Sequence, residues 1–481
     1  MADEYEVVIG MEVHAQLLTS SKLFCGCSTA FGAEPNTQVC PVCLGFPGVL
    51  PVLNERAVDF VVRTGLALNC EIAEESIFAR KNYFYPDLPK AYQITQYETP
   101  LCHKGYLDIE VEGNTRRIGI TRVHLEEDTA RTAHTGGDAS LVDYNRGGTP
   151  LMEIVTEPDI RSAEEAREYI VRLRQILRYL GVCDGNMEEG SLRCEPNVSI
   201  RPVGQKEFGT KVELKNLNSF RAVYNGLKYE LERQSRALRR GEAIVQETRR
   251  YFEETGKTGV MRSKESAHDY RYFPEPDLLQ LNLSPESISE RRAALPELPL
   301  AKKRRFLAEL GLSDYDATNL TEDRRLAGYF EDCLAAGADP KAAANWLMGD
   351  FLGKANEAGI AVWESQVSPK ALAELLALIA EGVISGKQAK QVFEVQFETG
   401  KSPKAIVEEQ GLAQISDDSA LQALVKQVVA DNADSLARYL AGNEKLIGFF
   451  VGQAMKASQG KANPQKLNEL LKTELESHRE G

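Results

Sequence analysis

Four cysteines near the N-terminus form the clearest chemical pattern in the sequence. Cys25 and Cys27 are followed by a second close pair, Cys40 and Cys43. Two such pairs on one loop can surround a single metal ion with four thiolates, in the tetrahedral geometry that Zn²⁺ prefers. Four sulfur ligands leave no position for water, so we expect a structural zinc site. The alternative is a set of four unliganded thiols.

A second pattern places Glu12, His14 and Gln16 two residues apart from one another. On a β-strand these three side chains share one face, and Met11 and Val13 share the other. A carboxylate and an imidazole on one face can bind the same cation. The same alternation also describes an ordinary strand with one solvated face, and both interpretations stay open.

Further acidic residues could complete a cation site. They occur in the segments 124–128 (HLEED) and 188–189, and at Glu153. Carboxylates with an imidazole and no cysteine suit a hard ion such as Mg²⁺, which keeps several waters and bridges phosphate oxygens. A site of this kind would serve phosphoryl transfer, where catalysis consists mainly of placement and charge neutralisation.

Other segments carry weaker or negative signals. The loop 80–87 (RKNYFYPD) joins two cations to three aromatic rings and could stack a base or bind a phosphate, or bury its rings in a core. The segment 256–258 (GKT) is not a phosphate-binding loop, because Tyr251 stands where that motif needs its first glycine. The sequence also lacks a G-x-S-x-G elbow, and we see no pair of serines that indicates a Ser-Ser-Lys amidase centre.

The elements that must position these residues fall into two kinds. Period-two alternation predicts strands over 7–17, 106–112, 117–125, 196–202 and 209–214. Helical spacing predicts helices over 163–180 and roughly 221–238, and Ser162 with Glu165 forms a capping box that predicts the N-cap of the first helix. After a Pro-bearing break at 295–300 the chain becomes rich in Ala, Leu, Glu and Lys, with almost no strand signal. We therefore predict an α+β fold: a mixed-sheet domain over 1–295, then all-α modules over 296–408 and 409–481.

Composition limits the function and location of the chain. Its 481 residues carry a formal net charge of −14, which argues against non-specific binding of nucleic acid but allows a local basic surface. No apolar run is long enough to span a membrane. The acidic N-terminus does not resemble a signal peptide, so we expect a cytoplasmic protein with reduced cysteines.

Long motifs in this sequence resemble the B subunit of the glutamyl-/aspartyl-tRNA amidotransferases, the GatB family, over essentially the whole chain. The matching segments are 9–14 (IGMEVH), 80–87, 124–128, 145–150 (NRGGTP), 187–193 (MEEGSLR), 213–220 (ELKNLNSF), 270–277 (YRYFPEPD), 345–349 (NWLMG) and 459–464 (QGKANP).

The resemblance implies an ATP-dependent ligase that converts mischarged Glu-tRNA(Gln) or Asp-tRNA(Asn) to the amide by way of a phosphorylated side-chain carboxylate. It implies a heterotrimer with an amidase partner, the A subunit, which releases ammonia from glutamine, and with a small third partner, the C subunit. The fold it implies is a cradle domain, a helical domain and a helical tail that binds tRNA.

The resemblance also assigns roles to individual residues. It places the Mg²⁺ of the catalytic centre at Glu12, His14, Glu127 and Glu153, and the ammonia path at Lys81 and Tyr83. Because Cys25, Cys27, Cys40 and Cys43 are all present, it implies the zinc-containing form of the family. It assigns no ATP-contacting residue.

Two alternatives stay open. The chain could be a non-catalytic scaffold that docks tRNA while its partners hold all the chemistry. A zinc-dependent hydrolase is the weaker alternative, because four sulfurs close the coordination shell of the metal.

Overall fold

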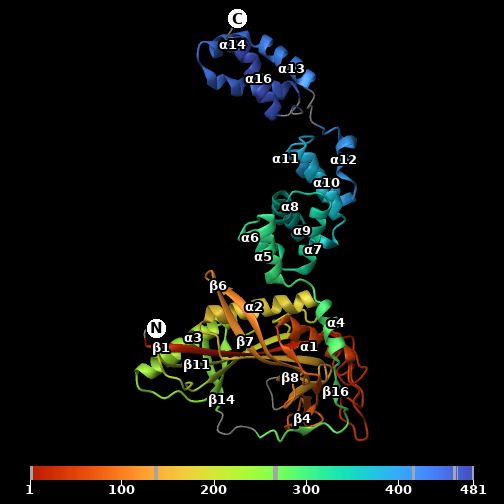
Figure 1. Cartoon of the computed structure of the whole chain (residues 1–481), viewed down its shortest axis with the longest axis vertical. Coiled ribbons are helices and arrows are strands. Elements are labelled where there is room, and N and C mark those ends of the chain that lie inside the picture. Colours follow the sequence, from red (N-terminus) through yellow and green to blue (C-terminus); the bar gives the residue numbers. More distant parts are fainter. Residues whose placement is uncertain are drawn as a thin grey trace. The chain divides into compact units, whose positions relative to one another are not determined.

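The computed structural model describes residues 4–134, 139–263, 269–413, 418–458, 462 and 464–478. Most of the motif at 459–464 lies outside these residues. The chain forms two compact units, Met1–Pro299 and Leu300–Gly481 (Figure 1). The first unit combines sheets and helices and the second is helical, which confirms the predicted α+β class with all-α modules behind it.

A nine-stranded mixed sheet organises the first unit, in the order β14-β13-β12-β11-β1-β10-β7-β6-β2. Neighbours are antiparallel except β12 and β13, which run parallel. The strands are β1 (Tyr5–Gln16), β2 (Glu71–Ile72), β6 (Cys102–Val111), β7 (Asn114–Glu127), β10 (Pro150–Thr156), β11 (Leu192–Pro202), β12 (Val212–Lys215), β13 (Glu247–Phe252) and β14 (Lys257–Ser263).

Strand β1 lies inside this sheet, between β11 and β10. Its side chains alternate as predicted: Met11, Val13 and Ala15 are buried in the core, whereas Glu12 and His14 face the other side of the sheet. The alternation follows from the pleat of a strand, in which successive side chains point to opposite faces. One face of the sheet is therefore apolar and the other polar.

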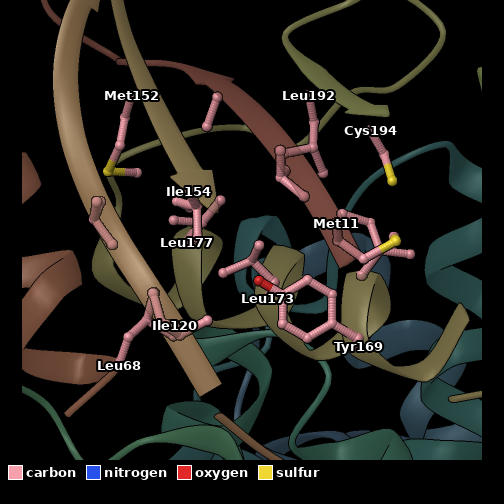
Figure 2. Packing of buried hydrophobic residues seen from close by; sticks show 14 of the residues in the cluster. Met11, Leu68, Ile120, Met152, Ile154, Tyr169, Leu173, Leu177, Leu192 and Cys194 are labelled. Atoms are coloured by element: carbon pink, nitrogen blue, oxygen red, sulfur yellow. The ribbon is translucent and has the colours of Figure 1, made fainter. Parts of the chain in front are cut away.

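Two long helices, α2 (Ala163–Leu180) and α3 (Phe220–Arg239), cover the apolar face. The Ser162 hydroxyl accepts a hydrogen bond from the Glu165 backbone N–H (3.0 Å), so the predicted N-cap of α2 is confirmed. Tyr169, Leu173 and Leu177 of α2 pack on Met11 and its neighbours (Figure 2). This packing anchors the strands, which keeps the polar face in a fixed register.

Shorter elements complete the first unit. Helices α1 (Glu55–Ala67) and α4 (Pro285–Ala293) pack against each other. Minor sheets contain β3 (Glu75–Ser76) with β16 (Leu281–Asn282), β8 (Arg131–His134) with β9 (Ser140–Asp143), and β4 (Ala79–Asn82) between β15 (Phe273–Pro274) and β5 (Tyr92–Thr95).

The second unit holds helices with two separate apolar cores. The first core is formed by α5 (Pro299–Leu310), α6 (Asp314–Leu320), α7 (Arg324–Ala335), α8 (Pro340–Trp346), α9 (Leu352–Ala358), α10 (Pro369–Ala380), α11 (Gly386–Thr399) and α12 (Pro403–Gln410). The second is formed by α13 (Asp418–Asp431), α14 (Ala433–Leu440), α15 (Ile447–Ala457) and α16 (Pro464–Ser477). Across the described parts of both units, we find no helix with the length and apolarity that a membrane crossing requires.

Candidate metal centre and catalytic site

Three of the predicted ligands meet on the polar face of the large sheet. His14 on β1 pairs in register with Glu153 on β10, and its Nε2 lies 3.3 Å from a Glu153 carboxylate oxygen. The same nitrogen lies 3.7 Å from a carboxylate oxygen of Glu12, two residues away on the strand. Segments about 140 positions apart in the chain thus supply one cluster, which the sequence could not show.

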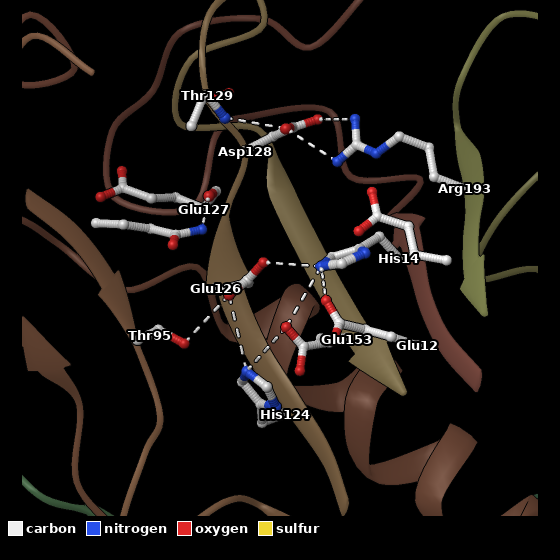
Figure 3. A network of polar contacts seen from close by, with 12 residues as sticks. Glu12, His14, Thr95, His124, Glu126, Glu127, Asp128, Thr129, Glu153 and Arg193 are labelled. Carbon is white, nitrogen blue, oxygen red and sulfur yellow. Dashed lines mark hydrogen bonds and ion pairs between the residues drawn. The ribbon is translucent and has the colours of Figure 1, made fainter. Parts of the chain in front are cut away.

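Strand β7 adds two residues that the sequence prediction did not assign, Glu126 and His124. A carboxylate oxygen of Glu126 lies 3.6 Å from His14 Nε2, and the other lies 3.7 Å from His124 Nε2 (Figure 3). His124 Nε2 is also 3.9 Å from Glu153. The sequence could have indicated both residues as ligands, because His124 and Glu126 have the same two-residue spacing as Glu12 and His14.

The structure does not bring Glu127 into this cluster. Its carboxylate forms an ion pair with Lys90 and accepts a hydrogen bond from the Ile94 backbone N–H (3.0 Å). Strand β7 extends to Glu127, so Glu126 and Glu127 point to opposite faces. Figure 3 shows the Glu127 carboxylate directed away from His14. Of the expected set of four, the structure brings Glu12, His14 and Glu153 together, and Glu126 of β7 lies beside them while Glu127 does not.

The electrostatics of the cluster are those of a cation site. Burial acts to lower the pKa of His14, but the hydrogen bond to Glu153 and the charges of Glu126, Glu153 and Glu12 raise it to about 9. Burial, together with the charge of Glu153, raises the pKa of Glu12. The carboxylates around His14 favour its charged form, and burial with the charge of Glu153 disfavours the negative charge of Glu12.

Lys81 and Tyr83 approach the cluster from the minor sheet and its following loop. The Lys81 ammonium lies 5.0 Å from the centre of the Tyr270 ring and 5.9 Å from that of Tyr83. Burial acts to lower the pKa of Lys81, but the charge of Glu126, the largest of several acidic and tyrosine contributions, raises it. Lys81 is therefore a cation held near the carboxylates by a separate element.

A rigid polar contact closes one end of the cluster. Buried Asp128 accepts two hydrogen bonds from the Arg193 guanidinium, both 3.1 Å, and one of 2.7 Å from the Gln16 amide. Burial raises the pKa of Asp128, but the charges of Arg193 and Arg146 outweigh it and lower the pKa to about 2. These bonds connect β1, β11 and the end of β7, and so fix the strands that carry the ligands.

The four predicted zinc ligands also come together. One sulfur each from Cys25, Cys27, Cys40 and Cys43 lies within 4.8 Å of the others. The Cys40 and Cys43 sulfurs are 4.0 Å apart, close to the roughly 3.8 Å between ligands that four Zn–S bonds of about 2.3 Å produce. All are free thiols in the structure. The cluster can hold a metal ion.

Contacts within the cluster favour the thiolate form of one cysteine, Cys43. A hydrogen bond from Cys25 is the main cause that lowers the pKa of Cys43 to about 4, and the charge of Lys22 adds to it. The Lys22 ammonium is buried and lies 3.5 Å from the Cys43 sulfur. A thiolate is the form of cysteine that binds metals, so this geometry fits a metal site.

The carboxylate cluster also fits a divalent ion. Ligand atoms of Glu12, His14 and Glu153 lie within 4.8 Å of one another, as do those of His124, Glu126 and Glu153. The Nδ1 atoms of His14 and His124 have no hydrogen-bond partner among the described residues. Oxygen donors with one or two imidazoles match the preferences of a hard cation.

Together, the fold and this site define a class: a domain built on a mixed sheet, with a cluster of carboxylates and imidazoles on its polar face that fits a cation, and helical modules after it. Residues 7–289 match the family model described as the GatB/GatE catalytic domain, and residues 328–475 match the one described as the GatB domain. The chain belongs to the GatB/GatE family.

Proteins of three bacteria match this sequence along nearly the whole chain, and all three carry the same name. Each is named as the B subunit of an aspartyl/glutamyl-tRNA(Asn/Gln) amidotransferase. The protein of Geobacter sulfurreducens is 56% identical over 98% of this chain and 99% of its own. The protein of Caldanaerobacter subterraneus is 57% identical over 98% of this chain and 99% of its own. The protein of Thermodesulfovibrio yellowstonii is 58% identical over 97% of this chain and 98% of its own.

Proposed function

We propose that this chain is the B subunit of an aspartyl/glutamyl-tRNA(Asn/Gln) amidotransferase and carries the centre that forms the amide. An oxygen of the aminoacyl side-chain carboxylate attacks the γ-phosphorus of ATP, and ADP leaves. Ammonia then adds to the carbonyl carbon of the acyl phosphate, inorganic phosphate leaves, and Gln-tRNA(Gln) or Asn-tRNA(Asn) remains. The first step turns a poor electrophile into a good one.

The convergence of Glu12, His14, Glu126 and Glu153 on one face of the sheet is the observation that carries this proposal. We propose that these residues, with His124 beside them, hold Mg²⁺. A divalent ion there would offset the repulsion between the substrate carboxylate and the phosphates. The three strands fix the ligand positions before substrate binds, so no rearrangement is needed at the moment of reaction.

Lys81 and Tyr83 are proposed to line the last part of the ammonia path. Among the interactions that raise the pKa of Lys81, the charge of Glu126 is the largest, and the aromatic rings of Tyr83 and Tyr270 lie near its ammonium. A positive charge at this position disfavours protonation of ammonia, and ammonium is not a nucleophile. A site shielded from water preserves the free base for the same reason.

We assign Zn²⁺ to the cluster of Cys25, Cys27, Cys40 and Cys43 as a structural ion. Reduced thiolates are the form this role requires, which agrees with a cytoplasmic location for the chain. The partners we propose are the amidase (the A subunit), the small C subunit and the tRNA. The helical tail 409–481, which begins beyond the helical module 296–408, is proposed to contact the tRNA.

The test is co-purification with the two proposed partner proteins, followed by an assay with mischarged Glu-tRNA(Gln) and Asp-tRNA(Asn). We expect ATP-dependent formation of the amide, and we expect Glu153→Gln to abolish it while glutamine hydrolysis by the partner stays measurable. Amide formation by the partner proteins without this chain would instead indicate a non-catalytic scaffold. Full activity of Glu153→Gln would refute the metal role.

A further inference from the structure

A fully buried lysine, Lys22, lies between the two cysteine pairs of the cluster. Only 1% of its surface is exposed. Its backbone N–H donates a hydrogen bond to the carbonyl of Cys27, in the first pair (2.9 Å). Its ammonium donates to the sulfur of Cys43, in the second pair (3.5 Å). This one residue therefore contacts both halves of the cluster.

The charge of Lys22 has no carboxylate partner. Besides the Cys43 sulfur, the ammonium contacts the Tyr144 carbonyl (3.2 Å), and it forms no ion pair with an acidic side chain among the residues that the structure describes. Glu127, which lines the same pocket, is paired with Lys90. A buried charge is costly unless an opposite charge offsets it. The thiolates of a metal-bound cluster are the negative groups that can offset this one.

A four-sulfur metal site also needs a cation beside it. Four thiolates around one Zn²⁺ leave an excess of negative charge. The Cys40 backbone N–H donates to the Cys43 sulfur (3.2 Å), but this dipole carries no net charge. Within the described part of the chain, Lys22 is the only side-chain cation that donates to a sulfur of the cluster. Lys22 can therefore offset the charge that the metal leaves uncompensated.

Backbone contacts hold Lys22 in this position. Its carbonyl accepts a hydrogen bond from the side-chain amide of Asn54 (3.3 Å), the N-cap residue of α1. The N–H of the next residue, Leu23, donates to the Gly148 carbonyl (2.8 Å). Gly148 has a φ of +85°, which favours glycine, and it lies against the Lys22 side chain and Cys43. These contacts direct the ammonium at the cluster before a metal binds.

We propose that Lys22 is a positioning residue of the zinc site: its ammonium supplies the positive charge that stabilises the four thiolates in their metal-bound form and holds the two cysteine pairs together. The inference rests on the zinc assignment made under the proposed function, and it adds a residue that the cysteine pattern does not indicate. Groups that contact the ligands of a metal usually contribute about 10- to 100-fold to metal affinity.

The alternative is a lysine that serves only the packing of its aliphatic stem and the hydrogen bond to Tyr144. That role would stabilise the fold equally with and without the metal site. The proposed role differs in sign between the two states. Without the thiolates, a buried ammonium that lacks a negative partner costs free energy, so its removal should be neutral or stabilising.

The first test measures zinc binding by the full-length chain in competition with a chromophoric chelator. Lys22→Met keeps an unbranched apolar stem and removes the charge. We expect its Kd for zinc to rise by about 10- to 100-fold, with faster transfer of zinc to the chelator. Lys228→Met is the matched control, because it removes the charge of an exposed lysine on α3. It should leave the Kd and the transfer rate unchanged.

Thermal unfolding separates the charge of Lys22 from its packing. In the chain with all four cysteines and zinc, Lys22→Met should lower the thermal midpoint. In the background of Cys40→Ser with Cys43→Ser, the same change should leave the midpoint unchanged or raise it. An equal fall in both backgrounds would overturn the proposal in favour of the packing role.

A spectroscopic measurement decides the question even if the double serine variant does not fold. With Co²⁺ in place of zinc, removal of the neighbouring cation leaves the thiolate electrons less stabilised. The sulfur-to-cobalt charge-transfer band of Lys22→Met should therefore move to lower energy than in the wild type. An unmoved band together with an unchanged Kd would refute the role of Lys22.

These outcomes also separate the inference from the function on which it rests. A wild-type chain that binds neither zinc nor cobalt refutes the zinc assignment. A wild type that binds zinc, together with Lys22→Met of equal Kd and transfer rate, refutes only the role of Lys22. A wild-type complex that binds zinc but forms no amide refutes the proposed reaction, and the comparison of Lys22→Met with the wild type still decides the role of Lys22.

Discussion

Glu126 and Glu127 are neighbours in the sequence but face opposite sides of β7, and this difference gives a sharp test of the metal centre. We expect Glu126→Gln to weaken binding of a divalent ion and Glu127→Gln to leave it nearly unchanged. Both changes replace a carboxylate by an amide of the same shape. Each therefore serves as the control for the other in size, strand position and loss of charge.

The expected magnitude follows from the distances. Glu126 oxygens lie 3.6 Å and 3.7 Å from the imidazoles of His14 and His124, so an ion held between His14 and this carboxylate would be about 4 Å or less from it. A unit charge interacts with a divalent ion at 4 Å by about 2 kcal/mol even in a medium like bulk water. That energy is about a 30-fold loss of affinity. The Glu127 charge is offset by Lys90, so we expect less than about a threefold loss there.

The assay is calorimetric titration of each purified complex with Mg²⁺, with Mn²⁺ binding followed by electron paramagnetic resonance as a second measurement. The Mg²⁺ dependence of amide formation should shift in parallel for Glu126→Gln. Circular dichroism and thermal unfolding confirm that both variants are folded. A loss of affinity in Glu127→Gln equal to or greater than that in Glu126→Gln would show that the ligand assignment from strand β7 is incorrect.

Three further predictions concern the structure around the centre. Replacing Cys40 and Cys43 together by Ser should remove about one zinc per chain by elemental analysis and lower the thermal midpoint; an unchanged zinc content would contradict the site. Because the pKa of Asp128 is lowered to about 2, this residue stabilises the fold by about 2 kcal/mol above pH 4, and the contribution disappears as the pH falls toward 2. The difference in unfolding free energy between wild type and Asp128→Asn should shrink over that interval, and a constant difference would argue against it. Leu173→Ala removes a fully buried side chain of α2 and should cost about 2–5 kcal/mol in denaturant unfolding, whereas the same change at exposed Leu279 should cost little.

The sequence by itself determined the local features of this protein. Alternation along β1 predicted that Glu12 and His14 share a face, because the period of a strand is fixed by its backbone. The N-cap at Ser162 and the apolar spacing that follows it predicted α2 with its observed ends, Ala163–Leu180. The two close cysteine pairs predicted a four-sulfur cluster, because a short loop is enough to bring them together. Each of these inferences depends on residues near one another in the chain.

Only the tertiary structure decided which distant residues meet. The partners of His14 are set by the order β11-β1-β10-β7 and by the pairing of His14 with Glu153 and of Glu153 with His124. The sequence predicted that this strand ends at residue 125, so it did not specify the face of the sheet to which Glu126 and Glu127 point. The true end at Glu127 made Glu126, and not its neighbour, face the centre. A shift of one residue reverses the face of a side chain, and register between distant strands is a property of the whole packed sheet.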